Sequence, residues 1–259
     1  MASRCASPLR LEDYLARIGH GGATEPTADT LCELHRAQAY SIPFENFDIT
    51  DGEGISLLPE ALIDKLVNRR RGGYCFELNA LLLMALRALG FEARPLLARV
   101  HLRGEPTGRG HQLSLVSIGG EDWIADVGFG ANGLRAPVAL RCGIINEQDG
   151  QRFRLVDADM YGTMLQLEQA QGWQDLYSFE LGHVCPADIE MGNHHTSTHP
   201  SSLFTRLRVA TLPTLRGRVS LLDHRLKIER DGAVSEIDLA EGPEFWRAVE
   251  QHFGIEFSA

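Results

Sequence analysis

Hydrophobic residues along the first ninety positions recur at the spacing of amphipathic helices. The pattern predicts a helix that ends at Gly19 and two more over about 28–39 and 59–69. The clearest helix covers 75–89, which is rich in leucine and alanine and is followed by Gly90, a residue typical of helix ends. Because this segment is apolar on nearly every side, we expect a buried central helix.

After Gly90 the pattern changes to short β-type runs separated by glycine, aspartate and proline. Six runs between about 91 and 180 predict an antiparallel meander or small barrel. The runs are FEARPLLARV, HQLSLVSI, DWIADVGF, FRLVDA, TMLQLEQ and WQDLYSFE. From about 190 we expect a loop over 191–202, strands over 203–212 and 218–230, and a helix over 243–253. This order predicts an α+β fold with three packed subdomains.

Composition and charge narrow the class of protein. The chain has 259 residues, enough for a large buried core, and a formal net charge of −10. This balance argues against a nucleic-acid-binding protein and against attachment to anionic lipid by charge. No apolar run reaches membrane-spanning length, and the N-terminus lacks the apolar core of a signal peptide. The five cysteines are widely spaced without a CxxC pair, so we expect a cytoplasmic protein with no membrane partner.

The segment RRGGYCFE places Cys75 in the first turn of the predicted central helix, two residues after a double glycine that interrupts the chain. Free N–H groups and the helix dipole favour a thiolate there, and the thiolate is the nucleophilic form. A cysteine on an apolar helix is equally often a small core residue. On this segment alone the two interpretations are balanced.

A candidate base and its orienting group lie on a predicted hairpin. His111 opens one run, Asp126 lies in the next, and Gly119-Gly120 separates them. If these two glycines form the whole loop, 113 pairs with 126; if the loop is two residues longer, 115 pairs with 126. Both registers place Asp126 on the face of His111, and in the first the two side chains are diagonal neighbours.

An aspartate within a hydrophobic strand is costly unless it has a partner. A nucleophilic cysteine needs a base, and the base needs an orienting group. We therefore predict a catalytic triad of Cys75, His111 and Asp126.

Two further patterns carry less weight. The segment 128–133 is a literal GxGxxG, but Pro137 and the antiparallel surroundings argue against a dinucleotide fold. We keep the hypothesis that the backbone N–H groups of this loop bind a phosphate. His194, His195 and His199 form an HHxxxH cluster. The following proline disfavours a helix and no further ligand completes a metal set, so we predict a solvated loop and no metal site.

The segments RRGGYCFELN and WIADVGFG, with a strand histidine between them, resemble those of the arylamine N-acetyltransferases. HRAQAYSIPFENFDI resembles the PFEN segment of that family, and MGNHHTSTHPSSLF resembles its entry into the last subdomain. The resemblance extends from about residue 8 to the last helix. It implies a helical bundle over 1–90, an antiparallel β-barrel over 91–190 and an α/β lid over 191–259, with a papain-like triad.

The resemblance also implies an activity. Members take an acetyl group from acetyl-CoA onto the cysteine and pass it to an arylamine, arylhydrazine or N-hydroxyarylamine. Cys75 would be acetylated, His111 would act as general base and later as proton donor, and Asp126 would orient it. Acetyl-CoA would be a cosubstrate, with no permanently bound cofactor. A cysteine hydrolase or amidase, or an amide-forming acyltransferase, with the same triad stays an alternative, and self-association into a homo-oligomer stays open.

Other residues match binding positions of the family. Phe44, Phe129 and Phe204 match aromatic residues of the acceptor and CoA cleft, and Gly128 and Gly130 belong to a loop beside CoA. The three phenylalanine side chains could stack on a flat aromatic amine and exclude water.

The resemblance also implies a buried ion pair, and this sequence departs from the family pattern at one position beside the histidine. Glu45 and Arg71 match a buried pair that braces the cysteine loop. Gly110 stands where several members carry a threonine before the histidine.

Overall fold

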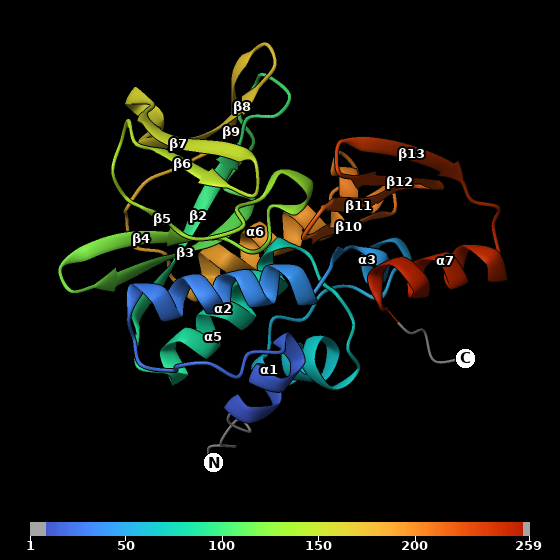
Figure 1. Cartoon of the computed structure of the whole chain (residues 1–259), viewed down its shortest axis with the longest axis horizontal. Coiled ribbons are helices and arrows are strands. Elements are labelled where there is room, and N and C mark those ends of the chain that lie inside the picture. Colours follow the sequence, from blue (N-terminus) through green and yellow to red (C-terminus); the bar gives the residue numbers. More distant parts are fainter. Residues whose placement is uncertain (1–8, 256–259) are drawn as a thin grey trace.

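Helix α5 (Cys75–Ala88) lies at the centre of the helical part of the computed structural model, which describes residues 9–255 (Figure 1). Ten of its fourteen residues are buried, and Gly90 follows its last turn with a positive φ of 85°. The surrounding helices are α1 (Leu11–Ile18), α2 (Ala28–Ser41), α4 (Pro59–Leu62) and the wider turn η1 (Ile63–Asn68). The predicted buried central helix and its neighbours are thus confirmed.

An eight-stranded antiparallel sheet curls into a nearly closed barrel beside these helices (Figure 1). Its strands are β2 (Glu92–Val100), β3 (His111–Ile118), β4 (Glu121–Ala125), β5 (Val138–Ala139), β6 (Ile145–Gln148), β7 (Gln151–Asp157), β8 (Thr163–Gln169) and β9 (Gly172–Phe179). Each of the six predicted runs contains one strand. The sequence pattern missed β5 and β6, which are too short to show alternation.

The hairpin of β3 and β4 has the tighter of the two predicted registers. Ile118 pairs with Glu121, so Gly119 and Gly120 form the whole loop, and both have positive φ. Two left-handed residues in succession match the turn that suits the twist of a two-residue hairpin. Strand β4 ends at Ala125, so Asp126 is the first residue after this strand.

The C-terminal part is a five-stranded antiparallel sheet packed against α3 (Phe47–Thr50) and α7 (Pro243–Phe253). Its strands are β1 (Phe44–Glu45), β10 (Val209–Thr214), β11 (Gly217–Leu222), β12 (Arg225–Arg230) and β13 (Ala233–Asp238). The predicted strands here were too long, because a 3₁₀ turn precedes β10 and a tight turn divides β11 from β12. Strand β13 escaped notice because it is exposed along its whole length. The domain boundaries at 90 and 190 stay a prediction, although β1 joins this sheet from the first ninety residues.

Helix α6 (Pro186–Thr198) overturns the predicted solvated loop over 191–202. Its local composition favours a helix poorly, and packing against other segments decides the outcome. Asn193 accepts a hydrogen bond from the Tyr74 hydroxyl, and Gly192 lies so close to Phe76 that an added Cβ would be 2.9 Å from the ring. The helix ends before Pro200, as steric restriction by proline requires.

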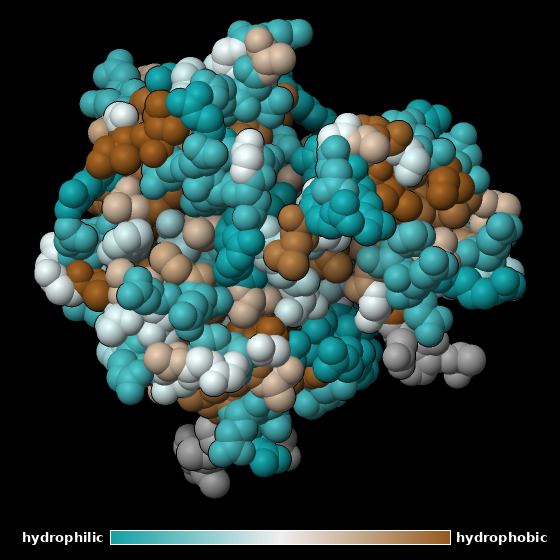
Figure 2. Space-filling model, viewed as in Figure 1, coloured by the Kyte–Doolittle hydropathy of each residue, from teal (hydrophilic) through white to brown (hydrophobic). Residues whose placement is uncertain are grey.

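The face drawn in Figure 2 is mostly hydrophilic, and its apolar side chains form separate patches. Within residues 9–255, no helix is both long and apolar enough to cross a membrane.

Candidate active site

Cys75 is the first residue of α5 and lines a cleft of about 600 Å³. Only 4% of the residue is exposed. The double glycine before it is a steric requirement: an added Cβ would lie 2.3 Å from the Pro43 carbonyl oxygen at Gly72 and 2.9 Å from Glu77 Oε2 at Gly73. A side chain at Gly72 would collide with the backbone of Pro43, and one at Gly73 would have to displace the side chains of Glu77 and Leu66.

His111 and Asp126 meet as the hairpin register predicts. His111 Nε2 lies 2.8 Å from Asp126 Oδ2, and both side chains are buried. Burial opposes ionisation of Asp126, but His111, Asn79 and the Gly128 N–H outweigh it, and the pKa of Asp126 is lowered. The carboxylate is thus charged and fully engaged at neutral pH.

The imidazole of His111 is protonated in this environment. Burial alone would lower its pKa, but Asp126 and then Cys75 outweigh that effect and raise the pKa of His111 to about 10. The ring also packs against Phe129 and Tyr177, with centroid distances of 5.1 and 5.0 Å. The cysteine thus faces a cation whose orientation is set by a carboxylate and two aromatic rings.

Asn79 connects the three elements that carry these groups, and the sequence analysis did not single it out. Its Nδ2 lies 2.6 Å from the Gln112 carbonyl oxygen and 2.9 Å from Asp126 Oδ1, and its Oδ1 accepts the Val127 N–H at 3.0 Å. It lies on α5 four residues after Cys75, on the same face of the helix. A buried polar residue on an apolar helix needs partners, and that was the available signal.

The three predicted phenylalanines line the same cleft as Cys75 and His111. Phe44 and Phe204 contact each other with ring centroids 5.8 Å apart. The structure therefore places the three phenylalanines at one site, and their roles in binding stay a prediction.

Gly110 stands at the position where several members of the family carry a threonine. It faces α6, and an added Cβ would lie 3.0 Å from Thr196 Oγ1.

The two predicted glycines differ in position. Gly128 lines the cleft, but its N–H donates to Asp126 Oδ1 at 2.9 Å, and an added Cβ would lie 2.8 Å from Cys75 Cα. Gly130 borders a smaller pocket and has a φ of 82°, which any other residue would adopt only with strain. Gly128 is thus required by packing beside Cys75, and the contact of this loop with CoA stays a prediction.

The GxGxxG segment opens no α-helix. A single 3₁₀ turn (Gly130–Asn132) lies within it, and the neighbouring strands are antiparallel. The antiparallel surroundings predicted for this segment are thus confirmed, and they exclude a dinucleotide-binding βαβ unit here. His195 of α6 stacks on His199, the residue after the helix, with ring centroids 4.5 Å apart. The described chain contains no group of three or more side chains suited to a metal ion.

Glu45 and Arg71 form the predicted buried pair. Arg71 Nη2 lies 2.9 Å from Glu45 Oε1 and 2.7 Å from Asp48 Oδ1, while Glu45 Oε2 accepts the Phe47 N–H at 2.8 Å. The pair therefore joins the segment before Cys75 to the start of α3.

Replacing Arg71 with alanine should destabilise the fold by roughly 3–5 kcal/mol, because it leaves the fully buried Glu45 without its cation. Urea unfolding followed by circular dichroism measures the change. Arg225→Ala removes an exposed arginine from β12 and should change stability by no more than about 0.5 kcal/mol. Equal stability of wild type and Arg71→Ala would contradict a bracing role.

Comparison with known proteins places this geometry in a family. A family model described as N-acetyltransferase matches residues 27–259. The arylamine N-acetyltransferase / N-hydroxyarylamine O-acetyltransferase of Salmonella typhimurium is 37% identical over 251 residues, covering 95% of this chain and 88% of that protein.

Solved structures agree with the sequence relatives. The arylamine N-acetyltransferase from Salmonella typhimurium superimposes with a TM-score of 0.90 at 34% identity, covering 95% of this chain and 90% of that one. The Mycobacterium marinum arylamine N-acetyltransferase in complex with CoA gives a TM-score of 0.88 at 35% identity, covering 95% and 92%. With this fold, this coverage and a matching family model, the chain belongs to the arylamine N-acetyltransferases.

Proposed function

We propose that this protein transfers an acetyl group from acetyl-CoA to an arylamine, arylhydrazine or N-hydroxyarylamine through a thioester on Cys75. The observation that carries the proposal is the convergence of Cys75 with the His111–Asp126 pair beside an apolar, aromatic-lined cleft. The CoA complex of the Mycobacterium marinum relative supports acetyl-CoA as the donor. Free cysteines, including the nucleophile, favour a reducing, cytoplasmic location.

The first half-reaction needs a thiolate and a proton donor, and we assign these roles to Cys75 and His111. Cys75 Sγ attacks the thioester carbonyl carbon of acetyl-CoA, forming a new C–S bond. The bond between that carbon and the CoA sulphur then breaks. The His111 imidazolium gives its proton to the departing sulphur, so CoA leaves as a neutral thiol and His111 becomes neutral.

The second half-reaction reverses the proton flow. The acceptor nitrogen, or the oxygen of an N-hydroxyarylamine, attacks the acetyl carbon while His111 takes its proton. The C–S bond to Cys75 breaks and restores the thiolate beside the imidazolium. Asp126 keeps the ring oriented in both steps and stays ionised.

The aromatic lining favours transfer to an amine over hydrolysis. Phe44, Phe129 and Phe204 offer flat apolar surfaces on which an aryl ring can stack beside Cys75. The same surfaces exclude water, whose attack on the thioester would waste the acetyl group.

Release of free CoA separates a transferase from a hydrolase with the same triad. Without an amine, we expect one rapid release of about one CoA per enzyme molecule, followed by slow turnover, as ping-pong chemistry requires. An arylamine or arylhydrazine should convert the burst into continuous release. Equally fast steady release without any amine would indicate a hydrolase, and no burst would reject acetyl transfer.

A further inference from the structure

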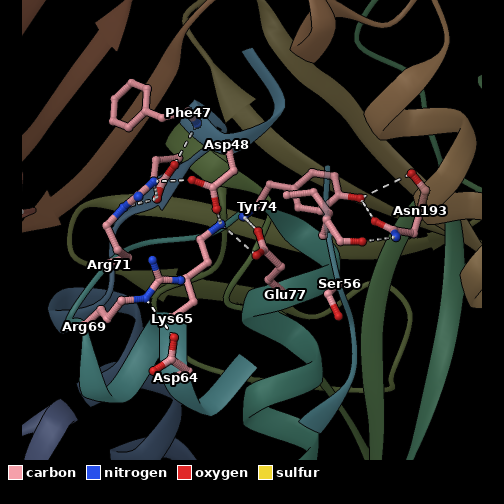
Figure 3. Close-up of polar contacts among 12 residues, drawn as sticks. Phe47, Asp48, Ser56, Asp64, Lys65, Arg69, Arg71, Tyr74, Glu77 and Asn193 are labelled. Atoms are coloured by element: carbon pink, nitrogen blue, oxygen red, sulfur yellow. Dashed lines mark hydrogen bonds and ion pairs between the residues drawn. The ribbon is translucent and has the colours of Figure 1, made fainter. Parts of the chain in front are cut away.

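Five charged side chains, four of them buried and one (Asp48) partly buried, form a connected group beside the loop that leads into Cys75, and Figure 3 labels all of them except Glu45. They are Glu45, Asp48, Lys65, Arg71 and Glu77. Glu45 and Arg71 form the brace described above. The function proposed so far leaves the remaining carboxylate–ammonium pair of Lys65 and Glu77 without a role.

Glu77 uses both of its carboxylate oxygens. Oε1 accepts a hydrogen bond from Lys65 Nζ at 2.8 Å, and Oε2 accepts the backbone N–H of Tyr74 at 3.0 Å. Lys65 in turn lies 2.7 Å from Asp48 Oδ2. Glu77 is only 2% exposed, so its side chain has one available arrangement between the ammonium group and the backbone.

The bonded backbone group belongs to the residue directly before the nucleophile. Tyr74 is the N-cap of α5, and Glu77 is the third helical residue, so the Glu77 carboxylate caps the helix by accepting the Tyr74 N–H. The Tyr74 hydroxyl donates to Asn193 Oδ1 of α6. Tyr74 is thus held at its backbone by Glu77 and at its ring by Asn193, and Cys75 follows with little freedom to turn away from His111.

We propose that Glu77, held in place by Lys65, is a positioning residue that sets the orientation of Cys75 for acetylation. The inference rests on the proposed function for its reaction step. Glu77 is not a lining residue of the cleft and touches neither the acceptor rings nor the path of acetyl-CoA. It acts through the Tyr74 peptide group alone.

The hydrogen-bond acceptor, not the negative charge, should matter for this role. Burial raises the pKa of Glu77 to about 7 despite the opposing effect of Lys65. The protonated and ionised forms therefore coexist near neutral pH. Each of them keeps an oxygen that can accept the Tyr74 N–H.

Two substitutions of similar shape separate these effects. Glu77→Gln loses the charge and turns its amide nitrogen toward Lys65, but its amide oxygen can still accept the Tyr74 N–H, whereas Glu77→Met loses both the charge and the acceptor. We expect Glu77→Met to lower the single-turnover rate of Cys75 acetylation by roughly 10–100-fold, because small misplacements of a reacting group have effects of this size. Glu77→Gln should stay within about threefold of wild type, and the acetyl-CoA concentration for half-maximal rate should not change in either variant.

Val249→Ala provides the matched control for loss of stability. Val249 is buried in α7, in the C-terminal cluster that excludes Cys75, so this variant should melt earlier and acetylate at the wild-type rate. The inference is overturned if Glu77→Met acetylates as fast as wild type, or if folded Glu77→Gln is slowed as much as Glu77→Met. Should Glu77→Met not fold, a tenfold slower acetylation of folded Glu77→Gln would still overturn it.

Alkylation of Cys75 by iodoacetamide separates this inference from the proposed function, because it requires no acetyl-CoA. Slower alkylation of Glu77→Met, with Glu77→Gln close to wild type, supports positioning even if wild type fails to acetylate. In that case only the proposed function falls. Equal alkylation rates in all three proteins would count against positioning.

Discussion

Cys75→Ala should abolish formation of the acetyl-enzyme and lower arylamine acetylation by about 10⁴-fold or more. In the proposed mechanism the sulphur is the only atom of the triad that bonds to the acetyl carbon, so neither His111 nor Asp126 could replace it. Intact mass spectrometry after mixing with acetyl-CoA, without amine, provides the measurement. Wild type should gain the mass of one acetyl group and lose it when an arylamine is added, whereas the variant should gain none.

Cys142→Ala is the matched control, because Cys142 is free, exposed and absent from the residues that line the cleft. This variant should acetylate as wild type does. Acetyl gain on Cys75→Ala, or loss of the gain in Cys142→Ala, would place the acetyl group on another residue.

Asp126→Asn should keep the fold and lower the acetylation rate by roughly 10³–10⁴-fold, the range seen when a triad carboxylate becomes an amide. The amide oxygen can still accept from Asn79 and the Gly128 N–H, but the amide nitrogen would face His111 Nε2. His111 would then turn neutral and carry its proton on the nitrogen that faces Cys75, where it cannot accept the thiol proton. Single-turnover acetylation measures the loss, and a rate within tenfold of wild type would refute the orienting role.

The same variant makes a prediction about stability and pH. The folded-state pKa of His111 is about 10, above the ordinary imidazole value, so its pairing with Asp126 contributes fully below about pH 6.5. That contribution is lost as the pH rises through about 10. The lowered pKa of Asp126 sets the acid limit, because its contribution is lost only as the pH falls through that lowered value. Urea unfolding should therefore show the stability gap between wild type and Asp126→Asn shrinking from pH 6.5 to pH 10, and a constant gap would contradict the pairing.

Local rules were sufficient for the parts of the site that lie on regular elements. Leucine and alanine content placed α5, and Gly90 marked its end. The two-residue period of strands placed His111 and Asp126 on one face, and the Gly119-Gly120 turn set the register that brings them together. The shared face could be worked out from the chain by itself, whereas the sequence left two registers open and the structure selected the tighter one.

Helix α6 shows where local rules failed. The sequence MGNHHTST has weak helical preference, and the prediction of a loop followed from it. The helix forms because Gly192 fits against Phe76 and Asn193 bonds to Tyr74, two residues more than a hundred positions earlier. Contacts of this range leave no periodic pattern in the sequence.

The chain by itself thus determined the central helix, six of the eight barrel strands and the shared face of His111 and Asp126, since each follows from spacing along one or two adjacent elements. Only the tertiary structure decided that Asn79 joins the three triad elements and that Lys65 and Glu77 hold the residue before Cys75. Such groups come from separate segments, and their partners are buried polar atoms whose need for a hydrogen bond is met only once those segments pack together.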